Sequence, residues 1–182
     1  MNLPNKLTML RIILIPVFLV LVLVDRIPMH YLWSLIVFLA ACITDTLDGN
    51  IARKRNLVTD FGKLMDPLAD KLLVMSALVA FIPVAGVPVW VVVVILGREF
   101  MVTSLRLIAA GKGVVIAADK WGKVKTISQM VWLNYTLLML WLFPEAGWVH
   151  ILFVVLMGIV VATTVLSGAN YMLKNKALYS DR

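Results

Sequence analysis

Six long apolar runs dominate this chain, and they constrain its fold more than any other feature. They cover approximately residues 10–24, 31–53, 64–82, 89–110, 123–143 and 149–173. Each is close to the roughly 20 residues that a helix needs to cross a bilayer. The pattern predicts an all-α, polytopic membrane protein with six transmembrane helices, preceded by a short interfacial segment at residues 2–9.

The composition supports this class and excludes an ordinary soluble domain. Of the 182 residues, 62% are hydrophobic, whereas soluble domains have about 45–50% apolar residues. This length leaves room for one membrane domain, which we expect to span residues 1–182. The net charge of +7 comes from only 15% charged residues, so the basic residues must gather in short loops and in a site. We expect the bilayer as a partner and no nucleic acid.

The basic residues also indicate the orientation of the chain in the membrane. One side would hold Lys6 and the stretches 53–63, 112–125 and 174–182, and the other side would hold only Arg26. Cytoplasmic loops carry the excess of lysine and arginine. This asymmetry predicts that both termini lie in the cytoplasm.

Four aspartates in a short window are the strongest functional signal. Asp45 and Asp48 are three residues apart, and Asp66 and Asp70 are four apart. Both spacings place side chains on one face of a helix. Acidic residues at such spacings are usually a solvated helix face, but these follow an apolar run, where a carboxylate costs about 2.5–3.5 kcal/mol. A divalent cation, which prefers oxygen ligands, would offset their repulsion.

Two carboxylate pairs on neighbouring helices can hold two metal ions about 3.5–4 Å apart and orient a phosphate ester for displacement. Gly49 would let a ligand or a second helix approach the backbone, and the two alternatives are about equal. Ala52 keeps the same face open, and Arg53 offers a bidentate contact to phosphate. The stretch predicts a metal–pyrophosphate site at the membrane surface. Asp70 is the expected general base.

A second basic group lies further along the chain. Arg98 lies well inside an apolar run, where an unpaired guanidinium is expensive. Either Glu99 beside it offsets the charge, or Arg98 lines a water-filled cavity. A second anion, separate from the pyrophosphate, would explain the group, whose members are Arg98, Arg106, Lys120, Lys123 and Lys125.

The acidic stretch resembles the signature of the CDP-alcohol phosphotransferase family. That signature reads D-x-x-D-G-x-x-A-R, eight residues, then G-x-x-x-D-x-x-x-D. Every fixed position matches, at Asp45, Asp48, Gly49, Ala52, Arg53, Gly62, Asp66 and Asp70. Softer motifs resemble the phosphatidylglycerophosphate synthase branch; they lie at residues 5–11, 97–106 and 122–129.

The resemblance implies a membrane enzyme of six helices, paired as a homodimer in the bacterial inner membrane, with its active site on the cytoplasmic side. CDP-diacylglycerol would donate a phosphatidyl group to sn-glycerol 3-phosphate, giving phosphatidylglycerophosphate and CMP. Two divalent ions, Mg²⁺ or Mn²⁺, would be required.

The resemblance also implies a role for each matching residue. The metal ligands would be Asp45, Asp48, Asp66 and Asp70, with Asp70 also the base. The CDP contacts would be Asn5, Thr8, Asp45, Gly49, Ala52 and Arg53. The acceptor phosphate would be bound by Arg98, Arg106, Lys120, Lys123 and Lys125.

Other functions remain open at this point. Within the family, the acceptor could be inositol phosphate, serine or phosphatidylglycerol, the last giving cardiolipin. Serine has no phosphate and would leave the second basic group without a purpose. From another class, the aspartates could line the path of a cation transporter, although the sequence lacks the internal repeat typical of transporters.

Overall fold

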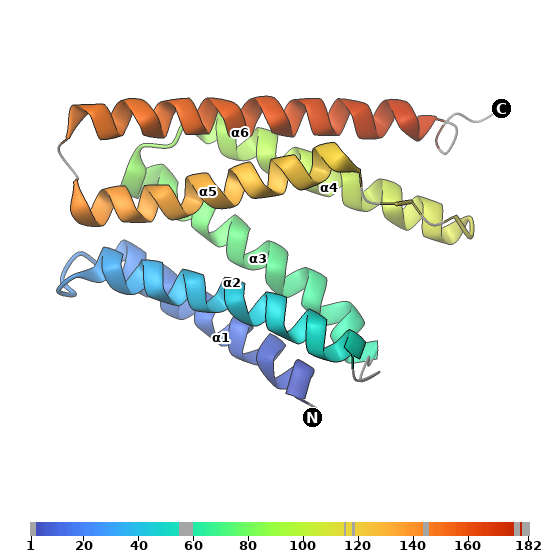
Figure 1. Cartoon of the computed structure of the whole chain (residues 1–182), viewed down its shortest axis with the longest axis horizontal. Coiled ribbons are helices and arrows are strands. Elements are labelled where there is room, and N and C mark those ends of the chain that lie inside the picture. Colours follow the sequence, from blue (N-terminus) through green and yellow to red (C-terminus); the bar gives the residue numbers. More distant parts are fainter. Residues whose placement is uncertain are drawn as a thin grey trace. The chain divides into compact units, whose positions relative to one another are not determined.

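The computed structural model describes residues 3–54, 60–114, 116–117, 119–143, 146–176 and 179, and the side chains of residues 3, 4, 45–54, 60, 61, 63 and 64 fall outside that description. Over the described residues the fold is all-helical, as predicted (Figure 1). The helices are α1 (Leu3–Leu23), α2 (His30–Lys54), α3 (Asp60–Ala85), α4 (Val89–Gly111), α5 (Lys120–Leu142) and α6 (Gly147–Lys174).

The predicted helix positions hold, but four boundaries differ by three residues or more; one is the start of α3, which lies at Asp60 and not at about residue 64. The predicted interfacial segment at residues 2–9 is not separate from the first helix, because α1 is continuous from Leu3. Pro83, expected in a turn, lies inside α3. Membrane helices tolerate interior proline because neighbouring groups satisfy the freed carbonyl. Lys120, expected in a loop, is the first residue of α5.

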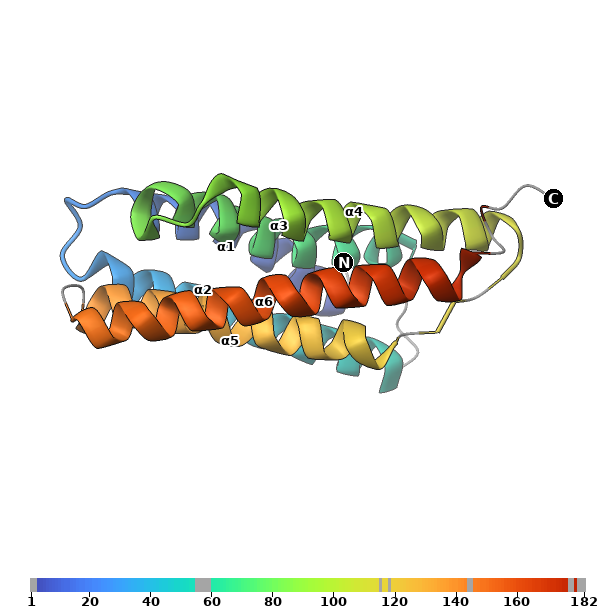
Figure 2. The ribbon, with the colours of Figure 1, turned by 90° about the horizontal axis from the view of Figure 1, so that it is seen from above.

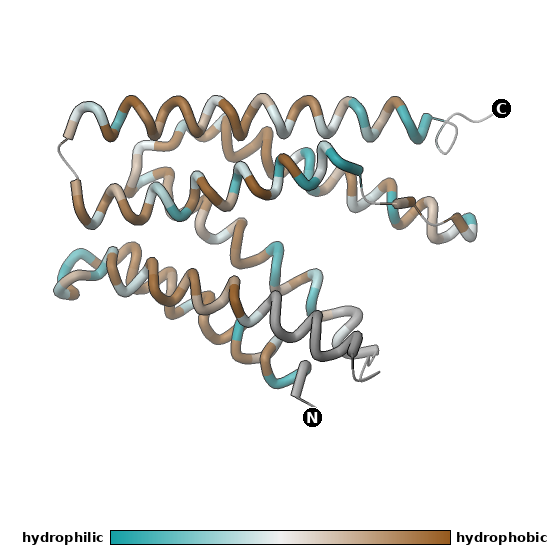
Figure 3. The backbone as a smooth tube through the Cα atoms, in the orientation of Figure 1, coloured by the Kyte–Doolittle hydropathy of each residue, from teal (hydrophilic) through white to brown (hydrophobic). Residues whose placement is uncertain are grey.

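Several helices combine the length and the apolar surface that a bilayer requires. Three described stretches are long and apolar enough to cross one: Asn5–Leu23, Met65–Ala85 and Gly147–Lys174. Apolar side chains also point outward, such as Ile13 and Val20 on α1 and Ile151 on α6, which are 57%, 54% and 67% exposed. Soluble monomers rarely expose contiguous apolar surfaces of this kind. Figure 3 shows these helices as largely hydrophobic. The chain is therefore a membrane protein.

The chain forms two compact units. The first comprises residues 1–86 and 136–144, and here α1 packs along both α2 and α3. One face of α1 is buried along its length, with residues spaced three or four apart: Asn5, Thr8, Arg11, Ile15, Phe18 and Val22. The first half of this stripe is polar and the second half is apolar. In the apolar half, the Phe18 ring packs against Phe38 of α2 with their centroids 5.6 Å apart.

The second unit comprises residues 87–135 and 145–182, and in it α4 packs along α6 (Figure 2). α4 ends in a turn that only glycine adopts easily. Gly113 has a φ of +71°, and the N–H of Val114 donates to the Ala109 carbonyl at 2.8 Å. This is the hydrogen-bond pattern that closes many helices at a glycine. It ends α4 after its third charged residue, Arg106.

Candidate functional site

In the first unit, the polar half of the α1 stripe faces the aspartate helix α3. The Thr8 hydroxyl donates a hydrogen bond to Asp66 Oδ1 over 2.5 Å. Thr8 is fully buried and Asp66 is half-buried. The structure thus brings together a residue predicted to contact CDP and a residue predicted to bind metal. Asn5, one turn before Thr8 and also predicted to contact CDP, is buried on the same face.

Arg11 continues this polar face one turn further. It is fully buried, and its Nε donates to the Ala41 carbonyl of α2 at 3.3 Å. A buried cation in an apolar helix is costly unless anions or carbonyls surround it. The Ala41 carbonyl is one such partner. Arg11 also adds a positive charge to the part of the unit in which the aspartate helices lie.

The helical spacing predicted for the aspartates is present in the backbone. Asp45 and Asp48 lie within the continuous helix α2, and Asp66 and Asp70 lie within α3. Each pair therefore shares a helix face. Asp70 is exposed. The predictions for the side chains of Asp45 and Asp48 fall outside the described residues, as do those for Gly49, Ala52 and Arg53.

Asp66 has the chemistry of a ligand for a divalent cation. Carboxylate oxygens are the ligands that Mg²⁺ and Mn²⁺ prefer. Thr8 donates to Oδ1 of Asp66, and Oδ2 accepts no hydrogen bond from the residues that the structure describes. Thr8 can therefore orient that carboxylate while Oδ2 stays available to a ligand. Such an orienting hydrogen bond is typical of ligating carboxylates. Asp66 is therefore suited to be one ligand of such an ion, and among the residues whose side chains are described no group of three or more acidic, histidine or cysteine side chains comes together.

In the second unit, a charged cluster joins α4 and α5. Glu99 Oε1 accepts from Arg98 Nη1 at 3.0 Å and from Lys125 Nζ at 2.5 Å. The three side chains are 21%, 11% and 4% exposed, in the order Glu99, Arg98, Lys125. One carboxylate therefore balances one buried and one largely buried cation, which leaves the cluster with a net charge of +1.

Arg98 also reaches α6, because two glycines leave it room. Its Nη2 donates to Ser167 Oγ at 2.6 Å. A Cβ on Gly168 would lie 3.3 Å from Arg98 Cγ and 3.2 Å from the end of Met101. A Cβ on Gly122 would lie 3.5 Å from Arg98 Nη2. The guanidinium is thus packed closely among three helices.

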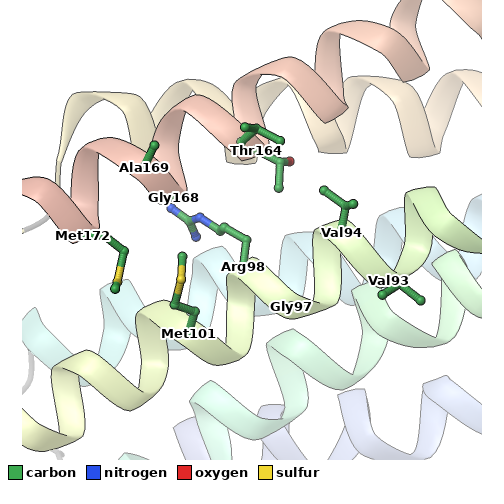
Figure 4. A pocket seen from close by; sticks show the side chains of 10 residues that line it. Val93, Val94, Gly97, Arg98, Met101, Thr164, Gly168, Ala169 and Met172 are labelled. Atoms are coloured by element: carbon green, nitrogen blue, oxygen red, sulfur yellow. The ribbon is translucent and has the colours of Figure 1, made fainter.

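A pocket of about 390 Å³ lies beside Arg98 between α4 and α6. Most of its lining is apolar, and Figure 4 shows Arg98 extending from α4 toward Gly168 of α6. Thr164 lines the pocket as well. The charged cluster of Arg98, Glu99 and Lys125 therefore lies beside a pocket formed by α4 and α6 of the same unit.

The other predicted basic residues are more open. Arg106 is exposed; its Nε donates to the Tyr171 hydroxyl at 3.1 Å, and its guanidinium carbon lies 5.8 Å from the Tyr171 ring centroid. Lys120 and Lys123 are exposed in the first turn of α5. Of the five predicted phosphate-binding residues, the structure joins Arg98 and Lys125 through Glu99 and holds Arg106 on Tyr171.

A second ion pair lies at the end of this unit that we predict to face the cytoplasm. Asp119, just before α5, accepts from Lys174 of α6 at 2.9 Å and from Asn170. The hydrogen bond from Lys174 is the largest influence lowering the pKa of Asp119, and the bond from Asn170 adds to it. This contact ties the start of α5 to the end of α6.

Sequence reasoning identified the basic residues but missed several of their partners. Ser167, Gly168 and Tyr171 lie more than 60 residues after the α4 residues they contact, and no local pattern marks them. Glu99, by contrast, was expected to offset the charge of Arg98, and the ion pair between them confirms this.

Comparison with known proteins agrees with the signature. A model of the family described as CDP-alcohol phosphatidyltransferase matches residues 1–167. A Bacillus subtilis (strain 168) protein named CDP-diacylglycerol--glycerol-3-phosphate 3-phosphatidyltransferase is 44% identical, with 96% of this chain and 95% of that protein covered. A Mycobacterium tuberculosis (strain CDC 1551 / Oshkosh) protein named probable phosphatidylglycerophosphate synthase is 39% identical, with 94% of this chain and 80% of that protein covered.

A protein of Rickettsia typhi (strain ATCC VR-144 / Wilmington), with the same name as the Bacillus one, is 42% identical over 75% of this chain and 76% of its own length. The resemblance seen in the acidic stretch thus extends over nearly the whole sequence and is confirmed. The chain belongs to the CDP-alcohol phosphatidyltransferase family.

Proposed function

We propose that the protein transfers a phosphatidyl group from CDP-diacylglycerol to sn-glycerol 3-phosphate, giving phosphatidylglycerophosphate and CMP. The main support is the identity of 44% across nearly the full length of a relative whose name states this reaction. The two charged centres suit the two substrates. An acidic centre in the first unit suits a metal-bound pyrophosphate, and a basic centre in the second suits an acceptor that carries its own phosphate.

The first unit would bind the nucleotide-linked lipid. Asp45, Asp48, Asp66 and Asp70 would hold two Mg²⁺ or Mn²⁺ ions. When bound, these ions would neutralise the pyrophosphate and the charge that develops on the leaving group. Asn5, Thr8, Asp45, Gly49, Ala52 and Arg53 would contact the CDP group. The hydrogen bond from Thr8 to Asp66 supports this, because it couples the two sets of residues.

The second unit would bind the acceptor phosphate through Arg98, Arg106, Lys120, Lys123 and Lys125. Of the three guanidinium nitrogens of Arg98, only Nη1 and Nη2 donate hydrogen bonds to described residues. Some of its N–H groups therefore remain for a phosphate. Arg106, held from one side by Tyr171, also keeps donors available. A guanidinium can bind a phosphate through two parallel hydrogen bonds.

The reaction would be a direct displacement at phosphorus. The acceptor hydroxyl oxygen forms a bond to the phosphorus that carries diacylglycerol, and the bond from that phosphorus to the bridging pyrophosphate oxygen breaks. CMP leaves with that oxygen. Asp70 takes the hydroxyl proton, as a general base within hydrogen-bond reach of its substrate does. Its exposed position on α3 is compatible with this role.

The protein would act as one domain over residues 1–182, with six transmembrane helices and as a homodimer. It would lie in the bacterial inner membrane, with the active site and both termini on the cytoplasmic side. The uninterrupted family match from residue 1 to 167 supports the single domain. The concentration of lysine and arginine in alternate loops supports the orientation.

An acceptor screen tests the function. Purified protein would be given labelled CDP-diacylglycerol and Mg²⁺, and CMP release would be followed with sn-glycerol 3-phosphate, inositol phosphate, serine or phosphatidylglycerol. We expect release with sn-glycerol 3-phosphate and little with the others. Release with another acceptor and none with sn-glycerol 3-phosphate would refute the proposal.

A further inference from the structure

Among the described residues, Glu99 uses only one of its two carboxylate oxygens. Both cations of the cluster, Arg98 and Lys125, contact the same oxygen, Oε1. Within the part of the chain that the structure describes, Oε2 receives no hydrogen bond, and the side chain is 21% exposed. A carboxylate oxygen can accept about two hydrogen bonds. Glu99 therefore offers an open acceptor in a charged cluster that is otherwise largely buried.

The chemistry of this acceptor limits what can bind it. A negatively charged group would be repelled by Glu99, whereas a neutral hydroxyl can donate to Oε2. The neighbouring Arg98 is suited to an anion, because its Nε has no hydrogen-bond partner among the described residues. The cluster as a whole carries a net charge of +1. It therefore suits a molecule that has an anionic group and, a few bonds away, a hydroxyl.

The proposed acceptor has this combination, and this inference rests on the proposed function. sn-Glycerol 3-phosphate carries one phosphate and two hydroxyls, and only one hydroxyl reacts. The second hydroxyl needs a partner once the acceptor leaves water, because an unpaired buried hydroxyl is costly. We propose that Glu99 Oε2 accepts a hydrogen bond from this non-reacting hydroxyl, so that Glu99 selects a polyol phosphate over an acceptor with a single hydroxyl.

A matched pair of acceptors isolates this contact. Propane-1,3-diol monophosphate keeps the phosphate and a terminal hydroxyl and lacks only the central hydroxyl of sn-glycerol 3-phosphate. Wild-type protein should prefer sn-glycerol 3-phosphate by roughly 10- to 100-fold in kcat/KM, the range expected for one hydrogen bond to a charged group. In Glu99→Gln this preference should fall to within about threefold. The KM for CDP-diacylglycerol should not change.

Asp119→Asn is the matched control. It also replaces a lysine-paired carboxylate of the same unit by an amide, but it lies outside the cluster. It should leave the preference between the two acceptors unchanged, even where it lowers thermal stability. If Glu99 has only a structural role, Glu99→Gln should behave like this control and keep the wild-type preference between the two acceptors.

A second variant covers the case in which Glu99→Gln does not fold. Glu99→Gln combined with Lys125→Met removes one charge of each sign, and replacing a buried pair together is often nearly neutral for stability. The acceptor preference should fall in this double variant as well, although its KM for both acceptors should rise.

The possible failures can be told apart. Wild-type protein that uses both acceptors equally well would overturn the role of Glu99, as would variants that keep the wild-type preference. Wild-type protein that turns over neither acceptor would overturn the proposed function itself, and the inference with it.

Discussion

Replacing Thr8 by valine would test whether the hydrogen bond to Asp66 positions the acidic centre. Valine keeps the branched shape of threonine, so the buried stripe of α1 stays filled. The change removes one hydroxyl that donates to Asp66 Oδ1 over 2.5 Å. Because Thr8 is fully buried, water cannot replace the hydroxyl on the α1 side.

The structure sets the size of the expected effect. A hydrogen bond to a charged group contributes about 1.5–3 kcal/mol. Asp66 is only half-buried, so water can recover part of its solvation, and we expect a loss of about 1–2 kcal/mol. For a chain of this length each kcal/mol lowers Tm by about 2–4 °C. The Tm of Thr8→Val should therefore fall by about 2–8 °C.

Two measurements check this result. Thermal unfolding of the purified protein in detergent, with a chelator present, gives the loss of stability without any contribution from metal binding. CMP release at increasing Mg²⁺ then shows whether a less well oriented Asp66 needs several times more metal. Thr8→Ser keeps the hydroxyl and should recover most of both properties.

Either of two results would refute the reasoning. Thr8→Val could unfold within 1 °C of wild type and keep the same Mg²⁺ requirement, in which case the hydroxyl does not matter. Alternatively, Thr8→Ser could lose as much as Thr8→Val, in which case the methyl group of Thr8 matters and its hydroxyl does not.

Three further predictions concern other residues. Asp70→Asn should reduce CMP release at least about 100-fold while Mn²⁺ still binds; turnover at the wild-type rate would remove Asp70 from the role of base. Arg106→Ala should raise the KM for sn-glycerol 3-phosphate about tenfold and leave that for CDP-diacylglycerol unchanged, and equal effects on both would argue against a separate acceptor site. The lowered pKa of Asp119 means that its contact with Lys174 stabilises the fold above the ordinary aspartate pKa of about 3.9 and is lost as the pH falls through the lower folded value. Thermal unfolding should therefore show a smaller acid-induced loss of stability in Asp119→Asn, and an identical loss would count against this contact.

The fold was largely predictable because the bilayer restricts what an apolar run can do. Runs of about 20 apolar residues have few alternatives to a helix in a membrane, so the helix positions followed from length alone. The errors arose where a helix continues beyond its apolar run. α1 includes the polar residues Asn5 and Thr8 because both are buried in the first unit, and this depends on packing that no local pattern reveals.

For the candidate site as well, features within one helix could be predicted and contacts between helices could not. The aspartate pairs could be predicted because three- and four-residue spacings act within one helix, and α2 and α3 preserve them. The surroundings of Arg98 depend instead on α6, and Ser167 lies 69 residues further along the chain. Contacts at such separations arise from how helices pack, and they carry no spacing that a single sequence displays.

The stripe on α1 has a consequence for how this helix tolerates change in length. Polar and apolar buried residues share one face, so the rotation of the helix is set at both ends at once, by Thr8 at one and Phe18 at the other. Each residue advances a helix by about 100°. Inserting a single leucine after Arg11 would leave the hydropathy profile almost unchanged, yet it would turn Thr8 away from Asp66 whenever Phe18 kept its place. Point substitutions that preserve size and polarity should therefore be tolerated in α1 far more readily than any insertion or deletion.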